Sequence, residues 1–496
     1  MTQKPNIILI MADQFRYDAI QSHDNPYLTT PTFDMMISQG TDFRQAYSAT
    51  PTCIPARASL LTGLSQTSTG LVGYQEGTAW DYPQFIATAL ADRGYYCKAV
   101  GKMHVHPPRK LCGFHHIDLH DGYLHATRNS QFAYGQAYTA TDDYLDWLLE
   151  QGHPPMDLND AGLSCNSWVG RPFPYPERLH PTNWATSKAM DFIRKRDTSM
   201  PFFLKLSYVR PHSPLDPPEY YFNLYRDRLK DLPEPQLAAW VENYGIDQAV
   251  DHIDAKTGRL SHMDYVNLLA GYYGLITHMD HQINRFFLHL EEYNLLHNSI
   301  ILFTSDHGDQ LGQHRLFRKG FPYQGSIHVP LIVWDPGNHI ASKDNKLKVV
   351  DQIVELRDIL PSLVDFADGS QVAGVDGKSI KPLMIKDQSQ TLAWRQSLHG
   401  EHVLGEFSNH YILSLPYKYI WYSQSGKEQL FNLDDDPDEN HDILADYPQV
   451  HAHLRAILVG HLKNRPEGFV SPDQELIAGR PLQTYLSPSQ SQNQIG

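Results

Sequence analysis

The chain has 496 residues, 41 % of them hydrophobic and 20 % charged, which is the composition of a globular protein with room for one large domain and a smaller second one. Its formal net charge of −15 disfavours nucleic acid and anionic membranes as partners, because both require a basic face. Four cysteines without CxxC spacing support neither a disulfide framework nor a structural zinc site, and no apolar run reaches the roughly 18 residues of a membrane span.

The first apolar segment, residues 6–12 (NIILIMA), predicts a buried β-strand. It lacks the small-residue cleavage site of a signal peptide and is followed by an acidic residue, Asp13. We therefore expect a cytoplasmic protein, or a periplasmic or secreted one if a leader has been removed.

Four further short apolar runs predict strands, and helix-like stretches at 83–93 and 266–293 lie between them. The runs are residues 95–100 (YYCKAV), 201–208 (PFFLKLSY), 299–305 (SIILFTS) and 329–334 (VPLIVW). This alternation predicts an α/β fold with a mostly parallel sheet.

Polar residues follow directly where four of these strands end. In α/β sheets, ligands bind beyond the carboxyl ends of the parallel strands, so these residues are candidates for a single site. For any one of them a helix-capping or turn-forming role is the alternative, but four such exits together favour a site. The candidates are Asp13, Gln14, Lys102, His104, His212, Asp306 and His307.

Cys53 begins the segment CIPARASLLTG, which predicts a helix because Pro55 suits a first helical turn and the following residues favour a helix. A helix N-terminus attracts anions, and Arg57, one turn further on, can bind an oxyanion at the same place. Elsewhere in a protein, a single cysteine is more often a small buried hydrophobe.

Cys53, Pro55 and Arg57, followed by Thr62 and Gly63, resemble the signature of the type I sulfatases. The resemblance to this family extends over most of the chain, as short sequence blocks in the same order as in the family. Many of these blocks contain the polar residues that follow the predicted strands. The blocks are DQFRYD, GKMHV, RPHSP, SDHGDQLGQH, residues 319–330 and EQLFNLDDDPDENHDI. The resemblance implies an alkaline phosphatase-like fold, a large mixed, mostly parallel sheet flanked by helices, with a small C-terminal antiparallel-sheet subdomain.

The resemblance also implies that Cys53 is oxidised to formylglycine, whose hydrated aldehyde is the nucleophile. It assigns Asp13, Gln14, Asp306 and His307 as ligands of a divalent cation, together with the modified residue 53. Oxygen donors favour Ca²⁺ or Mg²⁺, and one imidazole leaves Mn²⁺ open; we expect Ca²⁺. Many sulfatases have an Asp where this chain has Gln14. The neutral Gln14 side chain lowers the negative charge of the site by one.

The remaining roles also come from the resemblance. Arg57 and the metal favour an ionised hydroxyl at position 53, and Lys102 and Lys319 bind the sulfate oxygens. His212 hydrogen-bonds the sulfate or protonates the leaving oxygen. His104 takes the proton from the second hydroxyl, which expels sulfate and restores the aldehyde.

Domain boundaries follow from the later part of the sequence. Residues 357–366 (RDILPSLVDF) resemble the helix that closes the family's large domain, and residues 367–376 form a Gly-containing polar loop. Residues 411–422 and 429–433 predict a hairpin and a further strand of a small sheet. We expect a catalytic domain at 1–370, a C-terminal subdomain at 371–485 and a disordered tail at 486–496.

The predicted function is sulfate ester hydrolysis, of a small sulfated carbohydrate such as a glycosaminoglycan-type oligosaccharide, by exo action. A phosphonate monoester or phosphodiester hydrolase on the same site is the first alternative, and Gln14 resembles that group. An unmodified Cys53 thiolate and a non-catalytic, metal-stabilised glycan-binding module are weaker alternatives. The expected partners are the sulfated substrate and a formylglycine-generating or anaerobic sulfatase-maturating enzyme; the oligomeric state stays open.

Overall fold

The fold is built on one large sheet, seen in the computed structural model, which describes residues 4–122, 142–154, 158, 162–233, 235–390 and 392–487. The eight strands lie in the order β5-β4-β6-β1-β7-β8-β2-β9. They are β1 (Asn6–Asp13), β2 (Thr41–Phe43), β4 (Tyr96–Gly101), β5 (His116–Leu119), β6 (Phe202–Pro211), β7 (Ser299–Ser305), β8 (Leu331–Trp334) and β9 (Val349–Val350). A two-stranded sheet, β3 (Ala46–Tyr47) with β10 (Val354–Glu355), lies apart from it.

The centre of the large sheet is parallel. β1 pairs in parallel with β6 and with β7, and β4 pairs in parallel with β6 and β5, whereas β8 runs antiparallel to β7 and to β2. All eight residues of β1 are buried, as a strand covered on both faces requires. The predicted mixed, mostly parallel sheet is therefore confirmed.

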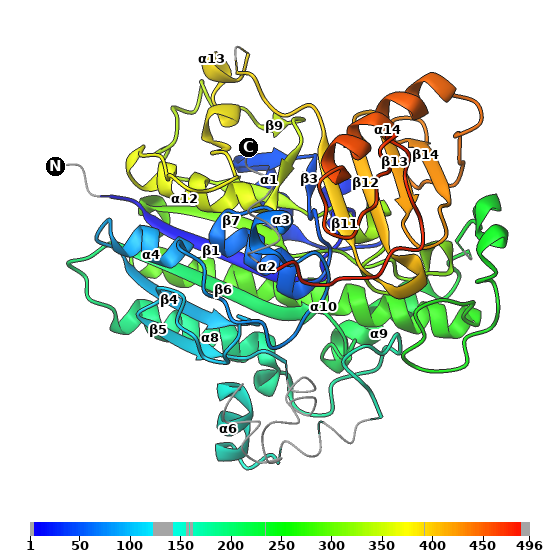
Figure 1. The fold of residues 1–496 in the computed structure, drawn as a ribbon. Helices are drawn as coiled ribbons and strands as arrows, with labels where there is room; N and C mark the ends of the chain where they lie inside the picture. The colour runs from blue at the N-terminus through cyan, green and yellow to red at the C-terminus, as the bar shows by residue number, and fades with distance from the viewer. Residues whose placement is uncertain are drawn as a thin grey trace.

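Helices cover both faces of the sheet (Figure 1). One core contains Ile8 and Ile10 of β1, and the other contains Ile7 and Leu9, because successive side chains of a strand point to opposite faces. On the first face pack α1 (Pro31–Gln39), α8 (Pro181–Lys195), α9 (Glu219–Leu229) and α10 (His262–Glu292); on the second pack α2 (Cys53–Thr62), α4 (Ile86–Ala91) and α12 (Ile359–Asp368). Shorter helices are α3 (Gln66–Thr69), α6 (Asp143–Glu150), α11 (Gln324–Ile327) and α13 (Lys386–Ser389).

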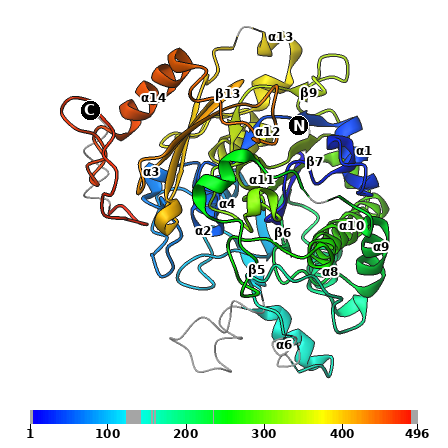
Figure 2. The ribbon, with the colours of Figure 1, turned by 90° about the vertical axis from the view of Figure 1, so that its right-hand side faces the viewer.

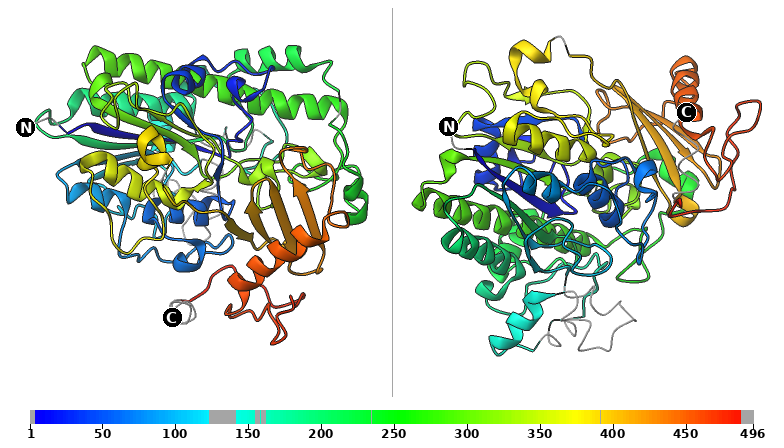
Figure 3. Two further views of the ribbon diagram at one scale, coloured as in Figure 1. Left: turned by 90° about the horizontal axis from the view of Figure 1, so that it is seen from above. Right: turned by 60° about the vertical axis from the view of Figure 1, so that its left-hand side comes forward.

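A second, antiparallel sheet in the order β11-β12-β13-β14 carries its own helix (Figure 3). Its elements are β11 (Leu398–His402), β12 (Asn409–Ser414), β13 (Tyr417–Tyr422), β14 (Glu428–Asn432) and α14 (Pro448–Leu462). One face packs Tyr411 and Leu413 toward loops of the large sheet, and the other packs Ile412 and Trp421 under α14. In Figure 1 this sheet lies on the side toward which β1 and β6 run, beside the carboxyl ends of the parallel strands.

The predicted elements agree closely with the observed ones. The predicted strand at 299–305 is β7 with the same bounds, the helix predicted at 266–293 is α10, and the predicted hairpin at 411–422 is β12 and β13. Of the tail predicted at 486–496, Leu486 is buried and donates to Gly70 O, and residues 488–496 lie outside the described residues. No helix in the described ranges is both long enough and apolar enough to cross a membrane.

Candidate active site

Cys53 is the first residue of helix α2, which lies at the carboxyl edge of the large sheet (Figure 2). Thr52 precedes it in an extended conformation, and the helix ends at Gly63, whose φ of 72° is in the left-handed region that glycine tolerates. Nine of the ten helix residues are buried, so the helix start is held firmly in the protein. The predicted helix N-terminus at Cys53 is confirmed.

The four predicted strand exits lie side by side, because β4, β6, β1 and β7 are consecutive neighbours in the sheet. Asp13 is the last residue of β1, Lys102 follows β4 directly, and Asp306 follows β7. His212 follows β6 in the same way. Parallel strands carry these side chains to one edge, where α2 presents Cys53.

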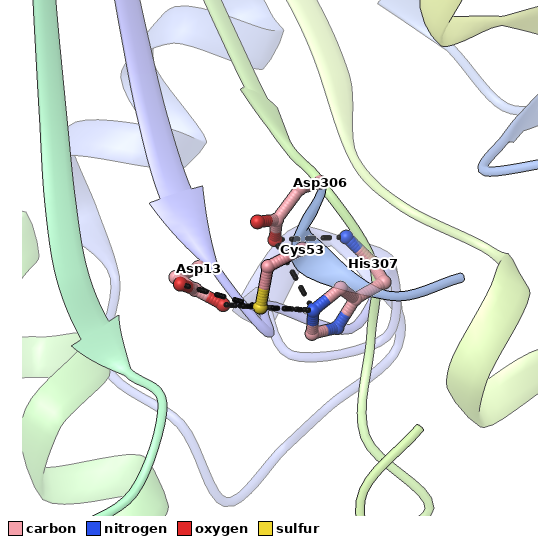
Figure 4. A group of neighbouring side chains, drawn as sticks. All are labelled: Asp13, Cys53, Asp306 and His307. Atoms are coloured by element: carbon pink, nitrogen blue, oxygen red, sulfur yellow. Dashed lines mark hydrogen bonds and ion pairs between the residues drawn. The ribbon is translucent and has the colours of Figure 1, made fainter. Parts of the chain in front are cut away.

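Four potential metal ligands surround a common point: donor atoms of Asp13, Cys53, Asp306 and His307 lie within 4.8 Å of one another, and all four residues are buried (Figure 4). The His307 Nδ1 lies 3.0 Å from Gly308 O, so Nδ1–H donates to that carbonyl and Nε2 faces Cys53 Sγ at 3.3 Å and Asp13 Oδ1 at 3.6 Å. Two buried carboxylates and one imidazole form a donor set that Ca²⁺, Mg²⁺ or Mn²⁺ can occupy.

The charges of this group fit a cation as well. Burial and the neighbouring Asp13 raise the pKa of Asp306. Two carboxylates so close together repel each other, and a divalent cation between them removes that repulsion. The residues present therefore fit a divalent metal ion.

Three cationic side chains, Lys102, Arg57 and Lys319, also lie near Cys53. The Lys102 Nζ is 2.5 Å from Asp13 Oδ2 and 3.7 Å from Cys53 Sγ. Arg57 is fully buried and donates from Nε to Asp306 Oδ2 at 2.8 Å, which fixes its guanidinium. Burial alone raises the pKa of the Cys53 thiol, but Lys102, Lys319 and His307 outweigh it and bring the pKa well below its ordinary value. Position 53 therefore lies in a potential that favours an anion.

Lys319 links Gln14 and His212. Its Nζ donates to Gln14 Oε1 at 2.6 Å and lies 2.6 Å from His212 Nε2. The His212 Nδ1 lies 2.8 Å from Ser213 O and donates to it, so Nε2 is the acceptor for the ammonium. Burial and Lys319 lower the pKa of His212 to about 4, which keeps the imidazole neutral at pH 7. In this arrangement the Gln14 amide oxygen faces Lys319, and its role as a metal ligand stays a prediction.

His104 completes the set. Its backbone has a φ of 54°, an uncommon conformation for a non-glycine residue, and its N–H donates to Asp121 Oδ1 at 2.9 Å. Its side chain is hydrogen-bonded to the Cys53 thiol. The nine other residues predicted for the site thus lie around Cys53.

Several supporting residues were not predicted. Asp309 accepts from Gln14 Nε2 at 2.5 Å, and Ser207 Oγ accepts from Arg57 at 3.0 Å. His402, from β11 of the small sheet, has its Nε2 3.0 Å from Thr52 Oγ1. Asp309 lies within the block SDHGDQ, where its spacing from Asp306 could have indicated it; no local pattern links residues as distant as Thr52 and His402.

Comparisons with known proteins show which family the chain resembles. A family model described as sulfatase matches residues 5–370, and one described as N-sulphoglucosamine sulphohydrolase, C-terminal, matches residues 312–464. The chain is 48 % identical over 483 residues to an arylsulfatase of Clostridium perfringens (strain 13 / Type A), covering 97 % of this chain and 99 % of the relative. Arylsulfatase K of Homo sapiens is 25 % identical over 472 residues, covering 90 % of this chain and 80 % of the relative.

Many solved structures share the fold, and two of them illustrate the similarity to the chain. A phosphonate monoester hydrolase of Agrobacterium radiobacter has a TM-score of 0.73 at 23 % identity, covering 96 % of this chain and all (100 %) of that one. A protein solved in complex with its substrate D-glucosamine-2-N,6-O-disulfate has a TM-score of 0.69 at 19 % identity, covering 93 % and 98 %. With the sulfatase model matching most of its length and an arylsulfatase nearly half identical along almost all of it, the chain belongs to the sulfatase family, the enzymes that hydrolyse sulfate esters.

Proposed function

We propose that this sulfatase uses a formylglycine made from Cys53 to hydrolyse the sulfate ester of a small carbohydrate. The observation that carries the proposal is the position of Cys53. It stands at a helix N-terminus, with the Lys102 ammonium 3.7 Å and the His307 Nε2 3.3 Å from its sulfur. A nucleophile at that point meets both positive charge and potential metal ligands.

Residue 53 supplies the nucleophile. The hydrated aldehyde of formylglycine provides an oxygen nucleophile at the place that Sγ occupies, and its second hydroxyl lets the sulfated residue break down without an external water. A divalent cation held by Asp13, Asp306 and His307, with Gln14 as a further ligand, supplies positive charge that favours the ionised oxygen. Arg57, fixed by Asp306, adds to the same potential.

Lys102 and Lys319 bind the sulfate. Both ammonium groups contribute to lowering the pKa of the Cys53 thiol, so both already stabilise negative charge at this position. Their charges are held in place before substrate arrives, Lys102 by Asp13 and Lys319 by Gln14. Preorganised charge of this kind stabilises a transition state more than mobile solvent does.

Two histidines handle protons. His104 is hydrogen-bonded to residue 53 and accepts the proton of its second hydroxyl. His212 is neutral and accepts from the Lys319 ammonium at Nε2, so the proton nearest to the bound sulfate is on Lys319. His212 acts as general acid only after it has taken that proton from Lys319, which then hydrogen-bonds the sulfate as a neutral amine.

Two similarities and the net charge of the chain favour a small sulfated sugar as substrate. A structural neighbour is solved with a sulfated glucosamine as its substrate, and the C-terminal family model takes its description from a sulphohydrolase of N-sulphoglucosamine. The net charge of −15 disfavours the long-range attraction of a long polyanion and favours a small or terminal sulfated sugar.

A phosphonate monoester hydrolase on the same site is the second candidate. Gln14, where many sulfatases have an Asp, and the structural likeness to a phosphonate monoester hydrolase favour it. The kcat/KM of matured protein for an aryl sulfate and for the corresponding aryl phosphonate monoester distinguishes the two. We expect the sulfate to be preferred at least about tenfold, a difference of about 1.4 kcal/mol in transition-state binding; a strong phosphonate preference would contradict the proposal.

The proposal also covers the domains, the maturation and the cellular location of the chain. We propose residues 1–370 as the catalytic domain and 371–485 as a C-terminal subdomain that closes one side of the site through His402. Maturation requires a formylglycine-generating or anaerobic sulfatase-maturating enzyme. We propose a cytoplasmic enzyme acting on imported oligosaccharides, and release of the native protein from cells would contradict this.

A further inference from the structure

A second group of potential metal ligands lies in the small C-terminal sheet. Among the described residues, His399, Glu401 and His410 bring their donor atoms within 4.8 Å of one another, away from the active-site group. The His399 Nε2 lies 3.4 Å from His410 Nδ1, and His410 Nδ1 lies 3.7 Å from Glu401 Oε2. Glu401 and His410 are buried, and His399 is half-buried.

The strand register explains why these three side chains meet. His399 and Glu401 are two residues apart on β11, so they share one face, and His410 of β12 stands directly opposite Glu401. This is the face under α14, where Ile412 and Trp421 pack. The opposite face of β11 carries His402, which bonds Thr52 beside the nucleophile.

The carboxylate is oriented toward the same point. Arg465 donates to Glu401 Oε1 at 2.8 Å and to Glu467 Oε1 at 2.6 Å, which leaves Glu401 Oε2 directed at His410. Ligating carboxylates in metal sites are commonly held by such an outer hydrogen bond. Trp421 and Phe469 pack against the His410 ring and provide an apolar wall.

We propose that His399, Glu401 and His410 bind a Zn²⁺ ion that ties the edge strand β11 to β12. Zn²⁺–nitrogen bonds of about 2.0–2.1 Å place two nitrogens of one tetrahedral ion about 3.3 Å apart, and the observed separation is 3.4 Å. Two imidazoles and one carboxylate favour Zn²⁺ over Ca²⁺, whereas the carboxylate pair of the active site favours Ca²⁺. The ion stabilises the strand whose other face positions Thr52.

The test is a calorimetric titration of full-length protein with Zn²⁺ in the presence of saturating Ca²⁺, which occupies the oxygen-rich catalytic group. We expect one Zn²⁺ per chain, and a Co²⁺ titration under the same conditions to give the visible absorption of a tetrahedral nitrogen and oxygen site. A wild-type chain that takes up no Zn²⁺ overturns the proposal, whatever the behaviour of any variant.

A matched pair of variants locates the ion. His399→Ala removes a half-buried ligand, and His453→Ala removes an exposed histidine of α14. We expect His399→Ala to weaken Zn²⁺ binding at least about 100-fold and to abolish the rise of Tm with Zn²⁺, while His453→Ala behaves as wild type. Unchanged Zn²⁺ affinity in His399→Ala, with a circular dichroism spectrum showing a folded chain, overturns the assignment.

Discussion

Lys102 and Asp13 form a fully buried ion pair at the nucleophile, with Lys102 Nζ 2.5 Å from Asp13 Oδ2 and 3.7 Å from Cys53 Sγ. The pair lets a chain of net charge −15 bind an anionic ester, because it holds a cation in place beside position 53. Burial lowers the pKa of Lys102, but Asp13 and Cys53 raise it by more, so the ammonium is retained.

Lys102→Ala tests the role of this cation. Loss of a preorganised charge at a developing anion lowers kcat by about 10²–10³. The change also leaves Asp13 buried without its partner, so stability falls by about 3–5 kcal/mol and the Tm should be measured beside kcat. Lys195→Ala, at an exposed position at the end of α8, is the control and should change neither quantity. Wild-type kcat in folded Lys102→Ala would remove Lys102 from the mechanism.

Metal removal tests the donor group of Asp13, Asp306 and His307. Dialysis of matured protein against EDTA should abolish sulfate hydrolysis, because position 53 loses its strongest cation. The Tm should fall as well, because the buried carboxylates again repel each other. Ca²⁺ should restore both quantities, and Mg²⁺ and Mn²⁺ serve as comparisons. Full activity in protein shown to be metal-free by elemental analysis would contradict the assignment.

The position of the small sheet depends on Gly400. A Cβ there would lie 2.0 Å from Cζ of Tyr411, the residue opposite on β12, whose hydroxyl donates to Ser48 O. Gly400→Ala therefore displaces the Tyr411 ring, and we expect a loss of about 1–3 kcal/mol of stability. Gly460→Ala is the control, since a Cβ at that position in α14 meets no atom within 4 Å. A thermal melt in which Gly400→Ala equals Gly460→Ala would refute this packing.

Buried histidines predict how stability depends on pH. Burial lowers the pKa of His402 to about 3 and of His314 to about 4, against an ordinary value of 6.5. Below pH 6.5 the unfolded chain binds protons at these sites and the folded chain does not, so the stability present above that pH is lost as the pH falls toward the folded values. Each residue removes up to about 1.4 kcal/mol per pH unit over that range.

The measurement is denaturant unfolding at pH 7.5, 6.0 and 5.0. His402→Gln should reduce the fall in unfolding free energy between pH 6.0 and 5.0, and the exposed His453→Gln should leave it unchanged. A fall of equal size in His402→Gln and wild type would show that His402 is protonated in the folded state.

The sequence predicted the catalytic sheet because its strands are short apolar runs that each end on a polar group. Asp13, Lys102 and Asp306 could be expected at one edge because each follows a predicted parallel strand, and the carboxyl ends of parallel strands share one edge. The antiparallel run of β8 relative to β7 had no such local signal, because a buried strand has the same pattern in either direction.

The side-chain contacts made by the small sheet could not be predicted from the sequence. Thr52 meets His402, and His399 meets His410, only through the packing of the small sheet and the register of β11 on β12. A shift of that register by one residue would turn His399 and Glu401 away from α14, and the intervening loop does not specify the register by its length alone.

The mass of the peptide containing Cys53, taken from protein produced in its native host, tests the central claim most directly. We predict the mass decrease that accompanies conversion of a thiol to an aldehyde, with arylsulfatase activity proportional to the converted fraction across preparations. A fully active preparation in which residue 53 is an unmodified thiol would contradict the proposed mechanism.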